Sequence, residues 1–372
     1  MTDIFSGLNT PQREAVLKTD GPILIFAGAG SGKTRVLTRK IAYLLQKKKT
    51  TANRILAVTF TNKAAREMKE RINELLGQAN YVNIGTFHSI GARILRGEKN
   101  IPDFSADFTI YDTADCKKII NECLKLTHTD PKELQASSVL HFISAQKQKL
   151  LIPEELDKKV HGKYLQEKLA YIYKEYEKQM RKNNAYDFDD LLMRPILMFR
   201  RHPEVAEKYR NRWDYVLVDE YQDTNPAQFE LLRYFSERTK NICVVGDDDQ
   251  SIYGWRGADI RNILEFEKHF PNAGIIKLEQ NYRSTRRIIE AASAMIKGNR
   301  KRADKSLWTK KEAGEKIEHK ECNKDIDEAE YIANEIMSSS RPPRDFALLY
   351  RTNAQSRLLE EALRNRGIRY VL

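Results

Sequence analysis

The sequence is poor in cysteine and has no long apolar stretch. Its 372 residues include 4 cysteines, and no two of them form a C-x-x-C pair. This spacing predicts neither a zinc site nor a disulfide framework, so reduced thiols are expected. No apolar run approaches the ~18 residues that a membrane-spanning helix needs. The N-terminal stretch also lacks the basic and then apolar order of a signal peptide. We therefore expect a cytoplasmic protein that does not enter a membrane.

Acidic residues are in the minority. The chain has 64 lysines and arginines against 52 aspartates and glutamates, a formal net charge of +12 at pH 7. This excess favours a polyanionic partner, for which nucleic acid and an acidic membrane surface both qualify. Lysines on solvent-exposed helix faces would give the same net charge, so charge alone does not show that such a partner exists. The length allows two or three domains with buried cores.

Strand and helix patterns alternate in the first part of the chain. The short apolar runs 22–26, 54–59 and 82–86 predict strands. Such alternation is typical of a parallel sheet covered by helices on both faces. From about residue 100 the strand signal fades, and apolar residues at spacings of three and four predict a helix over 163–182. We interpret residues 100–184 as a helical insertion.

The alternating pattern resumes after the insertion. Two strands and the helix between them are predicted over 215–218, 242–245 and 226–240. We therefore assign residues 1–99 and 185–272 to one α/β domain. In a further block, residues 273–372, two strands and two helices are predicted over 275–278, 346–351, 285–297 and 355–365. Gly367 is suited to end the last helix.

The strongest motif lies between the first strand and the helix that follows it. It consists of Ala27, Gly28, Ala29, Gly30, Ser31, Gly32, Lys33 and Thr34. Glycines allow a tight turn that aims backbone N–H groups at phosphate oxygens, and the helix N-terminus adds partial positive charge. We expect Lys33 to reach the β- and γ-phosphates of ATP and Thr34 to hold Mg²⁺. The strict pattern has glycine where Ala27 stands, but that position donates no catalytic group.

A phosphate loop needs a carboxylate from a neighbouring strand. Asp219 and Glu220 follow the predicted strand 215–218. We expect Asp219 to complete the Mg²⁺ shell and Glu220 to activate the attacking water. An acidic pair at a strand end is often only solvated, and its combination with the P-loop favours the functional interpretation. Gln12, on the opening turn of a predicted helix, offers a donor and an acceptor to an adenine edge.

Three predicted loops combine aromatic, hydroxyl and basic side chains, over 59–63, 86–89 and 253–257. Bases of a single strand stack on aromatic faces at ~1–3 kcal/mol each, whatever their sequence, while hydroxyls and cations hold phosphates. Trp255, flanked by glycine and arginine, favours stacking over a place in the core. Phe87 is as consistent with a core residue as with a ligand contact. His88 is as consistent with an ordinary hydrogen-bonded loop histidine as with a DNA contact.

Nine blocks in a fixed order carry a resemblance to a known family. They read LNTPQREAV, AGAGSGKTRV, AVTFTNKAAREMKER, GTFHSI, DFDDLL, VDEYQDTNPAQ, VVGDDDQSIYGWRGADI, LEQNYRST and LLYRTNAQSR. Through them the chain resembles the superfamily 1 helicases of the UvrD/Rep/PcrA type, most of all the PcrA-like members. The resemblance implies a P-loop NTPase fold. Its parts would be a RecA-like parallel-sheet domain with a helical insertion and, over 273–372, the first part of a second RecA-like domain.

The resemblance also implies roles for single residues. Gln12 would read adenine, and Arg35 and Tyr282 would sandwich the base. Gln250 would touch the γ-phosphate, and Arg283 would stabilise the charge that develops on it. The implied activity is ATP- and Mg²⁺-dependent 3′-to-5′ movement on single-stranded DNA with unwinding at single-strand/duplex junctions, by a monomer, in DNA repair or replication. The DNA path would be lined by Phe60, Thr61, Asn62, Thr86, His88, Tyr253, Trp255 and Arg256.

Two later blocks of the family are not found in the sequence, among them the one with a second arginine for the γ-phosphate. We therefore expect the chain alone to bind ATP–Mg and single-stranded DNA weakly, to hydrolyse ATP poorly and not to unwind duplexes. The alternatives are a nucleotide- and DNA-binding fragment without motor activity and the helicase part of a helicase–nuclease. A kinase or GTPase is disfavoured, because residues 219–223 and 250–255 have no use there. The acidic cluster 187–190 resembles a metal site, but we interpret it as structural.

Overall fold

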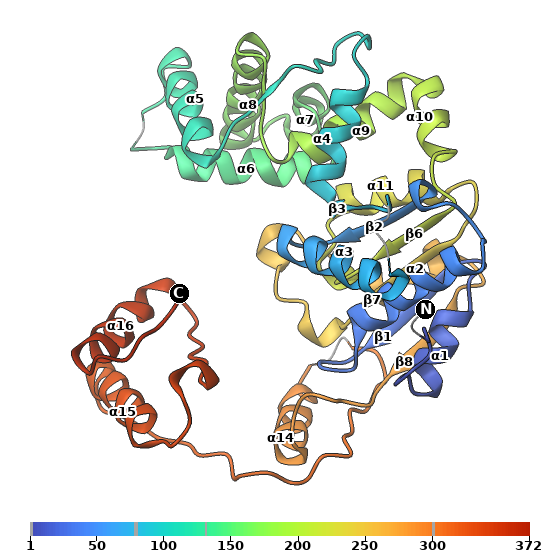
Figure 1. The fold of residues 1–372 in the computed structure, drawn as a ribbon. Helices are drawn as coiled ribbons and strands as arrows, with labels where there is room; N and C mark the ends of the chain where they lie inside the picture. Colours follow the sequence, from blue (N-terminus) through green and yellow to red (C-terminus); the bar gives the residue numbers. More distant parts are fainter. Residues whose placement is uncertain (1–2, 78–80, 131, 300–301) are drawn as a thin grey trace. The chain divides into compact units, whose positions relative to one another are not determined.

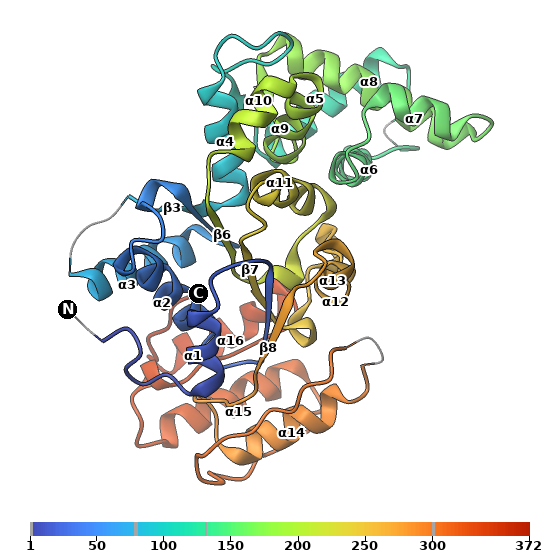
Figure 2. The same ribbon diagram turned by 90° about the vertical axis from the view of Figure 1, so that its right-hand side faces the viewer.

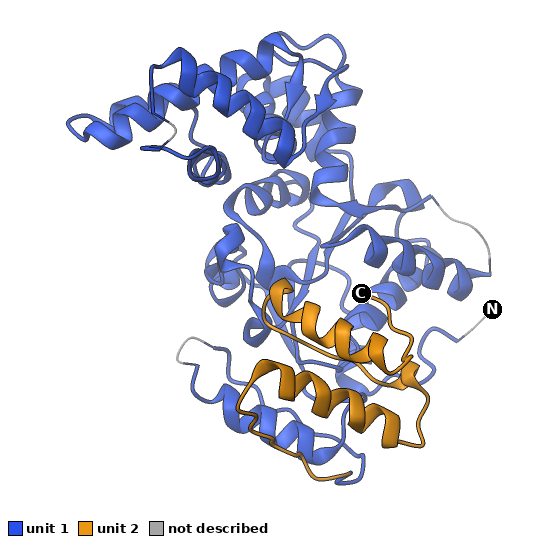
Figure 3. Cartoon of the chain, turned by 90° about the vertical axis from the view of Figure 1, so that its left-hand side faces the viewer, with its two compact units in different colours: residues 1–314 blue, residues 315–372 orange. Residues whose placement is uncertain are grey.

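The computed structural model of this protein describes residues 3–77, 81–130, 132–299 and 302–372. The chain divides into two compact units, Met1–Gly314 and Glu315–Leu372, which Figure 3 shows in different colours. We refer to them as unit 1 and unit 2. Within the described ranges, no helix is both long enough and apolar enough to cross a bilayer.

Unit 1 is built on a sheet of six strands in which every pairing is parallel. Across the sheet the order is β3 (Asn83–Thr86), β2 (Ile55–Thr59), β6 (Tyr215–Val218), β7 (Ile242–Gly246), β1 (Ile23–Ala27) and β8 (Gly274–Leu278). The carboxyl ends of these strands meet at one edge, where open α/β sheets place their ligands. The predicted α/β class with a parallel sheet is confirmed.

Successive strand residues enter two different cores. On β1, Ile23 and Ile25 join one apolar cluster, whereas Leu24 and Phe26 join another. The first cluster includes side chains of α1 (Thr10–Leu17), α2 (Lys33–Gln46) and α3 (Asn62–Leu76). The second includes side chains of α4 (Phe87–Gly97), α9 (Asp190–Arg201), α10 (Pro203–Arg210) and α11 (Pro226–Ser236). Because helices cover both faces, the whole of β1 is buried, and its sequence is continuously apolar.

The predicted helical insertion has a core of its own. Its helices are α5 (Thr113–Leu126), α6 (Ala136–Gln148), α7 (Pro153–Val160) and α8 (Tyr164–Lys182). The chain enters and leaves through two short strands that pair in parallel, β4 (Thr109–Ile110) and β5 (Ala185–Tyr186). Figures 1 and 2 show these helices gathered at one end of unit 1, beyond the sheet. The insertion is therefore a separate lobe on a short, paired stem.

Beyond β7, the regular secondary structure of the described residues consists of helices and the strand β8. Unit 1 continues with α12 (Arg261–Leu264), α13 (Phe266–His269) and α14 (Arg286–Ile296). Unit 2 contains α15 (Asp325–Ser338) and α16 (Ser356–Asn365). Their shared apolar core consists of Ala329, Ala333, Ile336, Ala362, Leu363 and Ile368. The predicted helix over 355–365 therefore agrees with α16.

Two features of the block 273–372 differ from the prediction. β8, expected to open a new block, pairs with β1 from Gly274 to Leu278 and forms the edge of the first sheet, and unit 1 continues to Gly314. The residues 346–351 are not part of any strand described in the structure. Their apolar run suggested a strand, but a strand forms only where a neighbouring segment pairs with its backbone groups. Leu349 in this stretch is exposed.

Candidate nucleotide and nucleic-acid sites

The glycine-rich loop joins β1 to α2 at the carboxyl edge of the sheet. β1 ends at Ala27, and α2 begins at Lys33. Gly32 precedes the helix with a φ of +92°, a left-handed conformation that glycine adopts at little cost. Ser31 Oγ donates a hydrogen bond to Gly28 O at 2.7 Å, within the turn. The loop therefore has the strand–turn–helix geometry that binds phosphate groups at a helix N-terminus.

Two side chains at the start of α2 face two carboxylates at the end of β6. Lys33 Nζ lies 2.8 Å from Glu220 Oε2, and Thr34 Oγ1 donates to Asp219 Oδ2 at 3.2 Å. These residues lie far apart in the sequence, and the parallel sheet brings them together. Hydroxyl and carboxylate oxygens are the ligands that Mg²⁺ prefers, and a lysine beside backbone N–H groups suits phosphate. The donor set fits a magnesium nucleotide.

The environment of Asp219 raises its pKa to about 6. Burial is the largest cause because it penalises the charged carboxylate, and the negative charge of Glu220 adds to it. Lys33 opposes the rise, together with hydrogen bonds from the Glu220 N–H and the Thr34 hydroxyl. Glu220 has a φ of +52°, which is uncommon for a residue other than glycine. Strained backbone of this kind is concentrated at functional sites.

Gln12 and Arg35, expected near the adenine, both adjoin the loop. Gln12 is buried on the first turn of α1, where its Nε2 donates to Ser31 O at 2.7 Å and its Oε1 accepts from Asn9 N at 3.1 Å. The amide therefore connects α1 with the phosphate loop. Arg35 is exposed on the first turn of α2, and its Nη1 donates to Gly7 O at 3.4 Å.

The residues after β8 lie along the same loop. Asn281 Nδ2 donates to Ala29 O at 2.6 Å, and Tyr282 N donates to Gly30 O at 3.0 Å. A Cβ placed on Gly30 would lie 2.8 Å from the Arg283 Cβ. The structure thus places Tyr282 and Arg283 beside the P-loop within unit 1, although the sequence assigned them to a second domain. The sequence did not single out Asn281, which connects the two segments.

A chain of hydrogen bonds links Glu220 to the end of β7. Gln222 is buried, and its Nε2 donates to Glu220 Oε2 at 2.9 Å. Its Oε1 accepts from Asp247 N at 3.0 Å, and Asp247 Oδ2 accepts from Gln250 Nε2. Gln250, the predicted γ-phosphate contact, is therefore held by a carboxylate. Gln222 was not predicted, and its place within the block VDEYQDTNPAQ was the signal that pointed to it.

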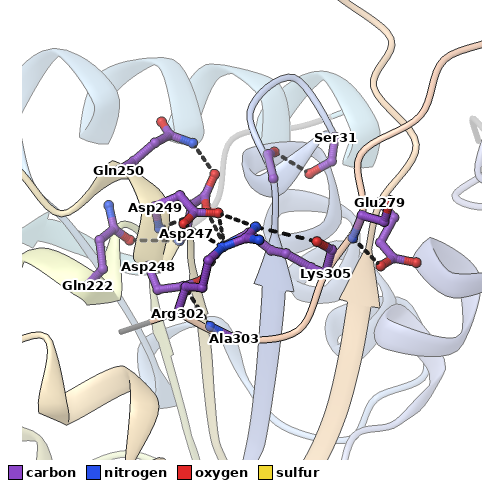
Figure 4. A network of polar contacts seen from close by, with 12 residues as sticks. Ser31, Gln222, Asp247, Asp248, Asp249, Gln250, Glu279, Arg302, Ala303 and Lys305 are labelled. Atoms are coloured by element: carbon purple, nitrogen blue, oxygen red, sulfur yellow. Dashed lines mark hydrogen bonds and ion pairs between the residues drawn. The ribbon is translucent and has the colours of Figure 1, made fainter. Parts of the chain in front are cut away.

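Asp247, Asp248 and Asp249 form the acidic group whose oxygens, among the described residues, lie close enough together to hold a metal ion. Lys305 Nζ occupies the space between them instead, and Arg302 pairs with Asp249 (Figure 4). Neither cation was predicted. Three adjacent carboxylates, of which Asp247 and Asp248 are buried, require a positive partner, but the lysine-rich stretch after α14 offered many candidates.

Aromatic side chains predicted to contact DNA form a cluster beside β2 and β7. The rings of Phe60 and Tyr253 are stacked with centroids 4.8 Å apart, and the ring of Trp255 lies 6.5 Å from that of Tyr253. The Arg256 guanidinium lies 4.6 Å from the Trp255 ring centroid. Trp255 is 69% exposed, so it is free to stack and is not a core residue. Phe87, by contrast, is buried and belongs to the core.

The polar members of the predicted DNA path lie at two helix starts. Thr61 caps α3, which begins at the exposed Asn62, and Thr86 caps α4. His88 contacts the exposed ring of Phe188 edge-on at 5.9 Å. Burial lowers the pKa of His88, and the charge of Asp189 only partly offsets this effect. His88 is therefore expected to be neutral at pH 7 and to act as a hydrogen-bonding or stacking group.

The acidic cluster 187–190 has a structural role, as the sequence interpretation held. The Lys147 side chain is fully buried, and its Nζ lies 2.7 Å from Asp187 Oδ2, 2.7 Å from Glu177 Oε1 and 2.9 Å from Asp190 Oδ2. Arg194 adds ion pairs to Glu177 and Asp190. Despite burial, the carboxylates raise the pKa of Lys147 well above its ordinary value. This network ties α6 and α8 of the insertion to α9.

Comparisons with known proteins place the chain among its relatives. A model of the UvrD/REP helicase N-terminal domain matches residues 8–271, and one of the UvrD-like helicase C-terminal domain matches residues 276–372. "ATP-dependent DNA helicase PcrA" of Bacillus subtilis (strain 168) is 50% identical over 372 residues, covering 99% of this chain and 50% of the relative. The protein of the same name from Staphylococcus aureus (strain Mu50) is 49% identical over 376 residues, covering 100% of this chain and 51% of the relative. The chain thus spans about half the length of these curated relatives. By both family models and by identity along its whole length, the chain belongs to the UvrD/Rep helicase family.

Proposed function

We propose that this chain is the ATP-hydrolysing part of a 3′-to-5′ DNA helicase that moves on single-stranded DNA. One observation carries the proposal: Lys33 and Thr34 at the phosphate loop face Asp219 and Glu220 across the carboxyl edge of the sheet. This arrangement suits a nucleoside triphosphate with its magnesium ion. The relatives named as ATP-dependent DNA helicases support the same activity.

Each residue of the site has a separate proposed role in phosphoryl transfer. Lys33 and the loop N–H groups would hold the phosphates, and Thr34 and Asp219 would hold Mg²⁺, which would neutralise charge on the phosphate oxygens. Lys33 must then leave Glu220, and the freed carboxylate can accept a proton from the attacking water. Arg283, beside the loop, supplies a cation for the γ-phosphate.

The aromatic cluster is proposed as the DNA contact. Phe60, Tyr253 and Trp255 offer ring faces, and Arg256 offers a cation beside them. Stacking does not distinguish one base from another, which suits a protein that moves along any sequence. We propose that Thr61, Asn62, Thr86 and His88 contact the same strand, and that single-strand/duplex junctions are the natural substrate.

The family also suggests a domain assignment. We propose that residues 1–99 and 185–272, with β8 added at the edge of the sheet, form the first RecA-like domain, that residues 100–184 are its insertion, and that the chain after β8 is the first part of a second RecA-like domain. The DNA-acting function makes the cytoplasm the expected location, and a monomer is the expected form. Closure of two such domains around ATP would produce the steps of movement.

A second candidate is a nucleotide- and DNA-binding part that does not turn over on its own. It is favoured by the coverage of only about half of the relatives' length. ATP hydrolysis by the 372-residue chain, measured with and without oligo-dT, separates the two. DNA-stimulated turnover that Lys33→Ala abolishes supports the motor function. Binding of a fluorescent ATP analogue without turnover supports the second candidate, and no nucleotide binding contradicts both.

A further inference from the structure

Residues 302–308, here called the strap, lie beside β8 and the glycine-rich loop. Trp308 N donates to Glu279 O at 3.0 Å. A Cβ placed on Gly28 would lie 2.1 Å from Leu307 Cδ2, so the Leu307 side chain rests on the backbone of the loop. The strap follows α14 in the sequence, yet these contacts hold it at the phosphate-binding edge of unit 1. The strap therefore lies close to the proposed nucleotide site.

Lys305 is the buried cation of the strap. Its Nζ lies 2.7 Å from Asp247 Oδ1 and 2.9 Å from Asp249 Oδ2 and contacts Asp248 Oδ1, and its side chain is only 2% exposed. Arg302 makes a two-pronged contact with Asp249, from Nε at 3.1 Å and from Nη2 at 2.9 Å. Figure 4 shows the lysine reaching from the strap into the aspartate run. One ammonium group therefore binds three consecutive carboxylates.

The three carboxylates need this cation to stay together. Like charges at such short range repel strongly, and burial weakens the screening by water. Burial by itself lowers the pKa of Lys305, but the three aspartates outweigh this effect and raise its pKa above the ordinary value. The lysine therefore stays charged at neutral pH. Unlike a bound metal ion, it cannot exchange with solvent, because it belongs to the chain.

Asp247 connects Lys305 with the nucleotide side of the site. Its Oδ1 faces Lys305, and its Oδ2 accepts from Gln250 Nε2. Its backbone N donates to Gln222 Oε1 at 3.0 Å, and Gln222 donates to Glu220 at 2.9 Å. Asp247 thus contacts the proposed γ-phosphate residue Gln250 through its carboxylate, and it is linked to the proposed general base Glu220 through its backbone N–H and Gln222.

We propose that Lys305 is a positioning residue for ATP hydrolysis. It fixes Asp247, and through Asp247 it holds Gln250 and Glu220 in the arrangement that turnover requires. Lys305 itself acts through other groups and does not reach the reacting phosphate. This inference rests on the function proposed above for Glu220 and Gln250.

Lys305→Met removes the charge and keeps most of the side-chain length. We expect kcat to fall roughly 10- to 100-fold, because small displacements of catalytic groups have costs of this size, while the Kd for a fluorescent ATP analogue changes less than about threefold. Lys305→Arg keeps the charge and should retain more of the turnover. Lys310→Met, at an exposed position just after the strap, is the matched control and should behave as the unaltered chain. A folded Lys305→Met variant with unaltered kcat would overturn the proposal.

A double variant separates positioning from simple neutralisation. Asp248→Asn combined with Lys305→Met removes one charge of each sign from the cluster. If Lys305 positions Asp247, the double variant should regain thermal stability but keep the low kcat. Full recovery of kcat would show that Lys305 only balances charge, and the proposal would fall.

Hydrogen exchange of the amides over 247–251 tests the structural step without any hydrolysis. Lys305→Met should accelerate exchange there at least roughly tenfold, in keeping with a loop that has lost its anchor, and Lys310→Met should not. Unchanged exchange would contradict the proposal even if the chain is an active ATPase. Faster exchange in a chain that neither binds nor hydrolyses ATP would instead contradict the proposed function.

Discussion

Glu220→Gln is the substitution that best tests the nucleotide site, because it removes one charge and almost no volume. Lys33 and Glu220 form a 2.8 Å ion pair, with side chains 12% and 35% exposed. Lys33 must break this pair to reach a phosphate. A hydrogen bond to a charged group is worth ~1.5–3 kcal/mol, and the partial exposure of Glu220 reduces this to about 1–2 kcal/mol. The glutamine variant should therefore bind nucleotide roughly 5- to 30-fold more tightly.

The same variant should lose turnover. Without a carboxylate to accept the proton of the attacking water, hydrolysis should fall roughly 10²- to 10⁴-fold. Titration of a fluorescent ATP analogue gives the affinity, and phosphate release with oligo-dT present gives the rate. Glu230→Gln is the control, because Glu230 is a half-buried residue of α11 whose one ion pair among the described residues is with the exposed Arg233.

The two readouts of Glu220→Gln refute different parts of the reasoning. Affinity equal to that of the unaltered chain would mean that the ion pair does not restrain Lys33. Turnover at the rate of the unaltered chain would mean that another group activates the water. Tighter binding with lost turnover is the combination that the geometry predicts.

Three further predictions follow from other parts of unit 1. Trp255→Ala should weaken binding of labelled oligo-dT by ~1–3 kcal/mol in fluorescence anisotropy and leave nucleotide affinity unchanged; equal DNA affinity would mean that the exposed ring does not stack on bases. Because the pKa of Asp219 is raised to about 6, a proton competes with Mg²⁺ below that pH, so Mg²⁺-dependent nucleotide affinity should fall from pH 7 to pH 5, and Asp219→Asn should abolish this dependence. By linkage, the raised pKa also means that Asp219 contributes stability that appears as the pH falls through about 6 and is lost as it rises. Lys147→Met should lower the free energy of unfolding in urea by ~3–5 kcal/mol, since it leaves buried carboxylates without their cation, whereas Lys149→Met at an exposed position should have little effect.

The sequence predicted the parts of the site that are local in the chain. The motif 27–34 is continuous in the sequence. The strand predicted before it, 22–26, agrees with β1 within one residue, and the expected helix, α2, follows it. The acidic pair after β6 was also found, because a run of apolar residues marks the strand that ends just before it. Periodicity and short motifs therefore suffice where neighbours in sequence are neighbours in space.

The features that the sequence did not reveal depend on long-range pairing. The sequence of β8 predicted a strand but not that this strand pairs with β1, because an edge strand has the same residue pattern in whichever sheet it joins. Gln222 and Asn281 are buried polar residues whose partners lie elsewhere in the fold. Lys305 was one lysine among many until the strap placed it among three aspartates. A sequence pattern predicts that buried charges need partners, but only the fold selects them.

The loop after β7 shows why such a partner matters for a motor. Gln250 is held on the nucleotide side of this loop, and Tyr253 and Trp255 follow within a few residues on the proposed DNA side. So short a connection can transmit a displacement only if its first part is rigid, since a mobile loop would absorb the movement. Lys305 supplies that rigidity by anchoring Asp247 through Asp249. If Lys305 positions Gln250 for hydrolysis as proposed, the same cation would also provide the fixed point from which a change at the γ-phosphate moves the aromatic stack.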